Sequence, residues 1–172
     1  LYVSLLIACP VDSFAVPAPI EQQTAKASGN PASVELNEKG VRAVKSDDFV
    51  AAESLFRKAL SADSHNLTAV FNLAGVYLNN KRQKEALSLL NQYLKEFTKD
   101  AGLYARRGDV QFSLKDLEAS TRDYETALKL EPQYPGVAAK LSTIYTLSRR
   151  TKDAEKMMML AVEQDPKNGQ LL

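Results

Sequence analysis

The chain has 172 residues, of which 45% are apolar and 25% are charged, an ordinary mixture for a globular protein. Its 22 basic residues nearly balance its 21 acidic ones, so the composition does not indicate a nucleic-acid-binding protein or a partner of strong opposite charge. The lone cysteine excludes a disulfide within one chain.

The first segment, residues 1–15, has the character of a signal peptide. Residues 1–9 are almost wholly apolar, but they are too short for a membrane-spanning helix of about 20 residues. The segment lacks an initiating methionine and a basic stretch, so we expect its start to be incomplete. We therefore expect an exported protein, periplasmic or secreted.

Two routes of processing are open for this segment. Ser13 and Ala15 place small residues at the third-last and last positions before a signal-peptidase cut ahead of Val16. Alternatively, residues 6–9 resemble a bacterial lipobox, in which Cys9 becomes the lipidated first residue of a membrane-anchored lipoprotein. Residues 16–32 contain proline, glycine and glutamine without apolar periodicity, which predicts a flexible linker.

A period of 34 residues begins after the linker and divides the chain into the units 33–66, 67–100, 101–134 and 135–168. Two series of small residues keep this period, Gly40, Ala74, Gly108, Ser142 and Ala52, Ala86, Ser120, Ala154. A column of larger apolar residues follows it as well, namely Phe56, Leu90, Tyr124 and Met158.

Each unit is predicted to form two helices joined by a polar turn. Asp48, and Asp116 in the third unit, can accept hydrogen bonds from free N–H groups where the second helix begins. We expect Gly40 to let the two helices approach closely at Ala52, because the side chains at a contact set the separation of helices. Phe56 would then fill the space against the next unit. Since one hairpin cannot bury both of its faces, the units must stack.

This pattern resembles the tetratricopeptide repeat family. The third unit carries the resemblance best, with Tyr104, Gly108, Tyr124, Ala127 and Pro132 in place. The resemblance implies an all-α fold, a right-handed superhelical solenoid of four consecutive 34-residue helix–turn–helix units. It also implies a concave face, lined by the first helix of each unit, that binds peptide segments.

The sequence predicts no catalytic, cofactor or metal site. His65 lies in a polar turn, and no cysteine or second histidine can share a site with it. A glycine-rich phosphate loop, a zinc-binding spacing and a nucleophile elbow are all absent from the sequence. We therefore expect a protein that is not an enzyme.

The resemblance selects candidate residues for a peptide-binding groove. Apolar side chains, amides and charged groups that flank the core column are predicted to line it: Asn37, Val41, Phe71, Asn72, Arg106, Asp109, Phe112 and Lys140. The amides would hold a peptide backbone, and the two cations would pair with a carboxylate.

Chaperone-binding members of the family clamp the C-terminal carboxylate of a peptide with basic and amide residues. The chain matches that pattern at Asn72 and Arg106, but it has Asn37, Val41 and Gly102 where the pattern has Lys, Asn and Lys. Because too little positive charge remains, we expect no carboxylate clamp.

The end of the fourth unit is unusually apolar. Met157, Met159 and Leu160 surround the core position Met158, and a helix that is apolar on all sides is typically buried. We expect further repeats, a capping helix or another subunit to cover these residues. Residues 169–172 would begin a further helix.

The function that best fits these observations is a non-catalytic scaffold or adaptor of the bacterial cell envelope that binds a protein or peptide partner. One alternative is a lipid-anchored assembly subunit, similar to pilotin-like or outer-membrane-assembly lipoproteins. Another is a repeat module from a longer enzyme or regulator.

Overall fold

The computed structural model describes residues 30–165, which form helices and no strand. The helices are α1 (Pro31–Lys45), α2 (Phe49–Ala62), α3 (Leu67–Asn79), α4 (Gln83–Leu94), α5 (Ala101–Ser113), α6 (Leu117–Leu130), α7 (Val137–Leu147) and α8 (Thr151–Gln164). The predicted signal segment 1–15, Cys9 and the end 169–172 lie outside the described residues.

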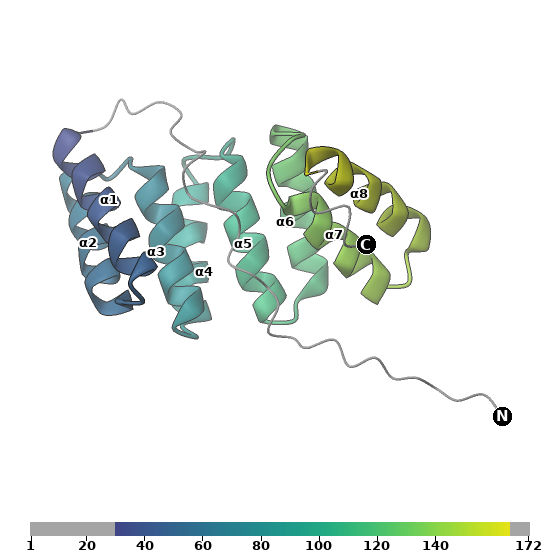
Figure 1. Ribbon diagram of the computed structural model, residues 1–172, viewed down its shortest axis with the longest axis horizontal. Helices are drawn as coiled ribbons and strands as arrows, with labels where there is room; N and C mark the ends of the chain where they lie inside the picture. Colours follow the sequence, from purple (N-terminus) through teal and green to yellow (C-terminus); the bar gives the residue numbers. More distant parts are fainter. Residues whose placement is uncertain (1–29, 166–172) are drawn as a thin grey trace.

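The helices follow one another along the long axis of the molecule in chain order (Figure 1). Each of the four predicted units contributes one helix pair, and each helix packs on its neighbours in the chain. The first helices of successive units also touch, α1 with α3 and α3 with α5. The predicted all-α solenoid is therefore confirmed.

Side-chain capping explains where α1, α2, α3, α5 and α6 begin. Asp48 accepts a hydrogen bond from the Ala51 amide at 2.9 Å, and Asp116 accepts one from the Ala119 amide at 3.0 Å, as predicted. The start of α1 differs from the prediction, because it lies inside the expected linker 16–32. Asn30 caps this helix by accepting from the Ala32 amide, and Pro31 suits the first turn, where its missing N–H costs nothing.

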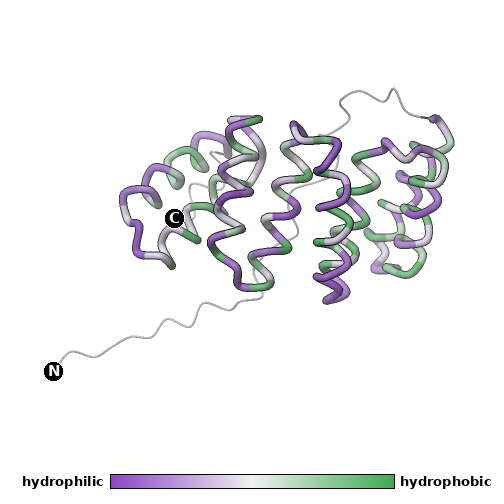
Figure 2. The backbone as a smooth tube through the Cα atoms, turned by 180° about the vertical axis from the view of Figure 1, so that it is seen from behind, coloured by the Kyte–Doolittle hydropathy of each residue, from purple (hydrophilic) through white to green (hydrophobic). Residues whose placement is uncertain are grey.

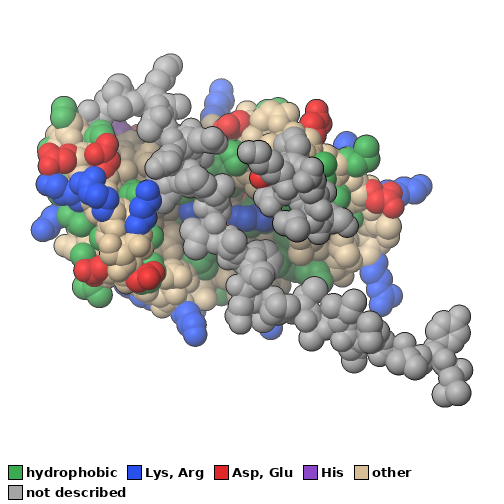
Figure 3. Space-filling model, viewed as in Figure 1, with side chains coloured by type: hydrophobic (Ala, Val, Ile, Leu, Met, Phe, Trp, Pro, Cys, Tyr) green, Lys and Arg blue, Asp and Glu red, His purple; other side chains and the backbone are tan. Residues whose placement is uncertain are grey.

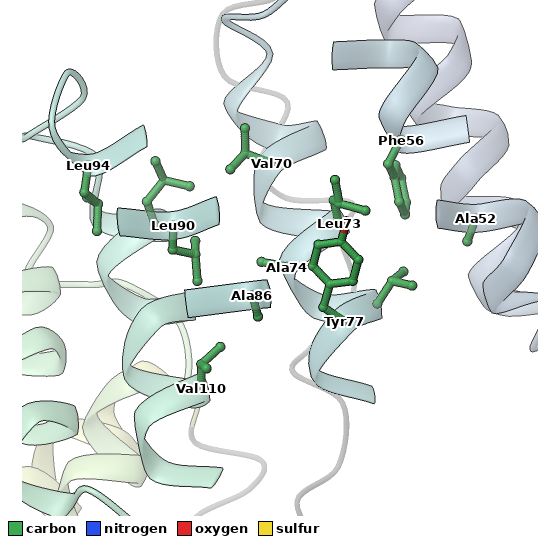
Figure 4. Packing of buried hydrophobic residues seen from close by; sticks show 12 residues of the cluster. Ala52, Phe56, Val70, Leu73, Ala74, Tyr77, Ala86, Leu90, Leu94 and Val110 are labelled. Atoms are coloured by element: carbon green, nitrogen blue, oxygen red, sulfur yellow. The ribbon is translucent and has the colours of Figure 1, made fainter. Parts of the chain in front are cut away.

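The core is built from the predicted column of large side chains. Phe56, Leu90 and Tyr124 are 0%, 0% and 1% exposed. In Figure 4, Leu73 and Tyr77 of α3 point toward Phe56 on α2, so each unit closes the apolar surface of the unit before it.

The close approach within a pair also involves the large side chain of the second helix. A Cβ atom built on Gly40 would lie 2.5 Å from the ring of Phe56, and one on Gly108 would lie 2.7 Å from the ring of Tyr124. The side chain nearest to Gly40 is therefore the Phe56 ring of its own unit. The glycine leaves room for a ring that the next unit then covers from the other side.

A polar contact accompanies the apolar one at each junction between units. Three side chains that share one repeat position, Arg57, Asn91 and Glu125, form these contacts. Tyr77 hydrogen-bonds to Arg57 at 2.6 Å, Arg107 donates to Asn91 at 2.8 Å, and Tyr145 donates to Glu125. These bonds fix how one unit is oriented on the next.

Hydrophobic and hydrophilic residues alternate along each helix (Figure 2), as one buried and one solvated face require. Among residues 30–165, no helix has the length and apolar character needed to cross a membrane.

The turn inside each unit contains a residue in the left-handed backbone region. These residues are Asp47, Lys81, Lys115 and Arg149, with φ between 57° and 63°. A side chain costs about 1–2 kcal/mol in this region, whereas glycine adopts it freely.

The Gly108→Ala variant tests the contact between glycine and ring. The added methyl group cannot fit against Tyr124 without displacing it, so the free energy of unfolding should fall by about 1–3 kcal/mol. Urea unfolding followed by circular dichroism measures this change. Gly75→Ala is the matched control, because its Cβ would meet Arg106 at an ordinary 3.5 Å and the helix should gain about 1 kcal/mol. Equal stabilisation by both variants would contradict the contact.

The Lys115→Gly variant tests the strained turn. Relief of the left-handed strain exceeds the entropy that glycine adds to the unfolded chain, so the protein should gain about 0.5–1 kcal/mol. The same substitution at the exposed Lys58, in the interior of α2, should cost about 0.5–1 kcal/mol. Thermal unfolding of the two variants separates these effects, and a loss of stability at Lys115 would exclude the strain.

Candidate peptide-binding face

The predicted groove residues lie on the first helices of the four units. We call the surface formed by α1, α3, α5 and α7 the A-helix face. The candidates on it are Asn37 and Val41 of α1, Phe71 and Asn72 of α3, Arg106, Asp109 and Phe112 of α5, and Lys140 of α7. The structure joins six of these eight residues into two clusters. Val41 and Phe112 are half-buried and pack against the core instead.

The first cluster is a pair of buried amides. Asn72 Nδ2 donates to Asn37 Oδ1 at 3.0 Å, across the junction between α1 and α3. An amide side chain has two donor hydrogens and an acceptor oxygen, so this bond uses part of the capacity of each group. The side-chain amino group of Asn37 and the side-chain carbonyl of Asn72 are not used in this bond. They can donate to and accept from the backbone of a peptide.

Arg106 is the centre of the second cluster. Its guanidinium carbon lies 3.8 Å from the centroid of the Phe71 ring, and its Nη1 donates to Asp109 Oδ2 at 3.2 Å. The whole residue is 9% exposed, and its Nε is buried without a hydrogen-bond partner. Gly75 faces the guanidinium, where a side chain would fill the space. The A-helix face therefore carries a buried cation, Arg106, with one N–H group that has no hydrogen-bond partner.

Asp109 is shared by several groups. Besides Arg106, it accepts from Lys140 of α7 and from the Tyr124 hydroxyl at 2.6 Å. Burial, together with the Asp109 charge, raises the pKa of Tyr124, so this hydroxyl stays protonated as a donor. Two cations face one carboxylate, which leaves one positive charge in excess.

Tyr124 was predicted from the sequence as a core residue, and its role in the cluster was missed. Its ring fills the core position, while its hydroxyl reaches Asp109 on the A-helix face. The other residues of its column, Phe56, Leu90 and Met158, have no hydroxyl group. That difference was the available signal, because a buried tyrosine hydroxyl requires a partner.

The face combines charge with apolar surface. Figure 3 shows Lys or Arg side chains and hydrophobic side chains near the middle of the molecule in the view of Figure 1. No group of three or more His, Cys, Asp or Glu residues within residues 30–165 is arranged to hold a metal ion. His65 is an exposed turn residue beside Phe97 and Glu96. The arrangement can bind polar and acidic groups non-covalently.

At the predicted apolar end, the residues left exposed are not the predicted set Met157, Met159 and Leu160. Met157 and Leu160 are half-buried, and Met157 packs against the core of the last two units. Met159 is 74% exposed. Met158, predicted as a core residue, is 36% exposed because no following helix among the described residues covers it. An open surface depression of about 470 Å³ lies along α8 at these two methionines.

Comparison with known proteins gives the family. Two models described as tetratricopeptide repeat match residues 43–106 and 101–134, together more than half of the chain. RNA polymerase II-associated protein 3 of Mus musculus is 34% identical over 97 residues, which is 56% of this chain. The chain spans 15% of the length of that relative.

Solved structures of tetratricopeptide repeat proteins have a similar fold. The first TPR of Spaghetti (RPAP3), bound to the HSP90 peptide SRMEEVD, has a TM-score of 0.64 and 29% identity, covering 69% of this chain and 96% of that one. The pilF protein of Pseudomonas aeruginosa has a TM-score of 0.70 at 21% identity, covering 77% of this chain and 61% of that one, a likeness of fold. The repeated units, their helix pairs and these matches show that the chain belongs to the tetratricopeptide repeat family.

Proposed function

We propose that this protein is a non-catalytic adaptor that binds an acidic peptide segment across the A-helix face. The observation that supports this proposal is the Arg106 cluster, where two cations share one carboxylate and a buried N–H has no partner. An acidic group from a ligand would neutralise the excess charge and form a charge-assisted hydrogen bond.

The two clusters suit different parts of one extended ligand. The amide pair Asn37–Asn72 lies on α1 and α3, and the Arg106 cluster lies on α3, α5 and α7. A segment running along the row of helices would meet backbone-binding amides first and a cation next. The peptide bound to the RPAP3 domain, SRMEEVD, is an acidic segment of this kind and provides a probe.

Replacing Arg106 with alanine should weaken binding of fluorescein-labelled SRMEEVD about tenfold or more, because a hydrogen bond to a charged group contributes about 1.5–3 kcal/mol. Fluorescence anisotropy titration measures the Kd, and higher salt should reduce the difference. Arg122→Ala on α6, which removes an exposed arginine away from this face, is the control. Identical Kd values for wild type and Arg106→Ala would exclude this site.

A second titration separates an internal acidic side chain from a terminal carboxylate. The residues at 37, 41 and 102 lack the two lysines and the amide of a carboxylate clamp, so SRMEEVD and its C-terminal amide should bind within about twofold of each other. A large preference for the free acid would show that a clamp exists despite Asn37, Val41 and Gly102.

We further propose that the adaptor is exported to the bacterial cell envelope. The apolar residues 1–9 and the small residues Ser13 and Ala15 support this. Intact mass of the protein, expressed with its native flanking sequence, should correspond to a chain that begins at Val16. A mass beginning at an acylated Cys9 would indicate the lipoprotein route, and an uncut leader would refute export by either route.

A further inference from the structure

The exposed face of α8 is the place where the next helix of the array would pack. Its residues are Glu155, Met158, Met159 and Val162, and we call them the α8 face. α8 is the last helix of the described row (Figure 1), and its main contact is with α7. Met158 and Val162 are each 36% exposed, whereas Phe56, Leu90 and Tyr124, which share the repeat position of Met158, are buried. The α8 face therefore continues the series of established interfaces between units.

Glu155 gives this face a charge preference. It has the same repeat position as Glu53, which faces the second unit and accepts a hydrogen bond from Arg82 at 2.5 Å. The bonds from Arg82 and Arg57 lower the pKa of Glu53 against the effect of burial, so a cation is the fitting partner at this place. Glu155 lines the open depression along α8 with Met158 and Met159, and no ion pair within residues 30–165 involves it. The occupant should carry an arginine or lysine there.

Met159 distinguishes the face from the junctions within the chain. The residues at its repeat position, Arg57, Asn91 and Glu125, each hydrogen-bond to the next unit. A methionine side chain has only a weakly accepting sulfur atom, so it cannot form a hydrogen bond as strong as these. The α8 face is thus more apolar than the surfaces that join the chain's own units, which favours a helix with an apolar stripe over another repeat of the same kind.

A second copy of the chain does not fit this face. In a head-to-tail contact, Asp48 of the second copy would take the place of Arg82 and face Glu155, a repulsion between like charges. A symmetric contact between two α8 helices, centred on the methionines, would leave Glu155 opposite Val162 without a cation.

We propose that the α8 face binds an amphipathic helix of a partner protein, one with an apolar stripe and a basic residue that pairs with Glu155. The stripe would cover Met158, Met159 and Val162, as α3 covers Phe56 on α2. This site is separate from the A-helix face and does not depend on the proposed acidic ligand.

A designed helix provides the probe. We would use a fluorescein-labelled, stapled peptide of about four turns, with leucines on one face and one arginine beside them, and a twin with glutamine in place of the arginine. The arginine peptide should bind the full chain about five- to tenfold more tightly than its twin. Glu155→Gln should abolish that difference and leave the affinity for the glutamine twin unchanged, which isolates the pair from general apolar binding.

Met159→Gln should weaken both peptides about fivefold or more, since it removes apolar contact area without touching the charge. Val50→Gln on α2 is the matched control, because Val50 is an exposed apolar residue far along the array, and it should change neither affinity. Equal affinity of the two peptides for the wild-type chain, or binding unaffected by Met159→Gln, would overturn the proposal.

Two further measurements address other occupants. Sedimentation of the chain alone should show a monomer, and a dimer that Met159→Gln dissociates would replace the partner helix with a second copy. Peroxide should oxidise Met159 as quickly in the monomeric protein with its native flanking sequence as in the 172-residue chain. Protection in that longer monomer would show that its own chain covers the face, and would overturn the proposal.

Discussion

The structure depends on one constraint: a helix pair cannot bury the large side chain on its second helix without help from the next pair. Phe56 and Tyr124 each lie over a glycine of their own unit, Gly40 or Gly108, and this covers one side of the ring. The other side needs the first helix of the following unit. Stacking is therefore required at every junction, and the 34-residue period records that each unit meets the same requirement.

Most of the fold was predictable because its signals are local or periodic. The helix pairs follow from apolar spacing, and the caps at Asp48 and Asp116 lie beside the amides that they bind. The spacing shows which face a residue occupies but not which ring lies nearest to it, so the contact between Gly40 and the Phe56 ring was seen only in the structure. The cap at Asn30 was missed for a related reason, since it lies outside the repeating units.

The bonding of the candidate residues was not predictable. Resemblance to the family placed Arg106, Asp109 and Lys140 on one face, and in the structure both cations pair with Asp109. The competition of two cations for one carboxylate depends on the separation of α5 and α7, which no sequence pattern specifies. The part of Tyr124 required three-dimensional information too, because its ring belongs to the core and its hydroxyl to the face.

The two ends of the described array meet the stacking constraint in opposite ways. At the first end, Asn30 hydrogen-bonds to Asp63 and to the Ala62 carbonyl, and Lys39 and Asp48 stand where the second unit carries the apolar Leu73 and the junction residue Arg82. A solenoid that ends in this way exposes polar groups that water can satisfy. The α8 end has the apolar residues of a junction between units. It has Met159 in place of the polar residue, such as Arg57, that hydrogen-bonds to the next unit. Removing apolar surface from water is favourable wherever a complementary helix exists. The α8 end is therefore better suited than the α1 end to pack against a further helix.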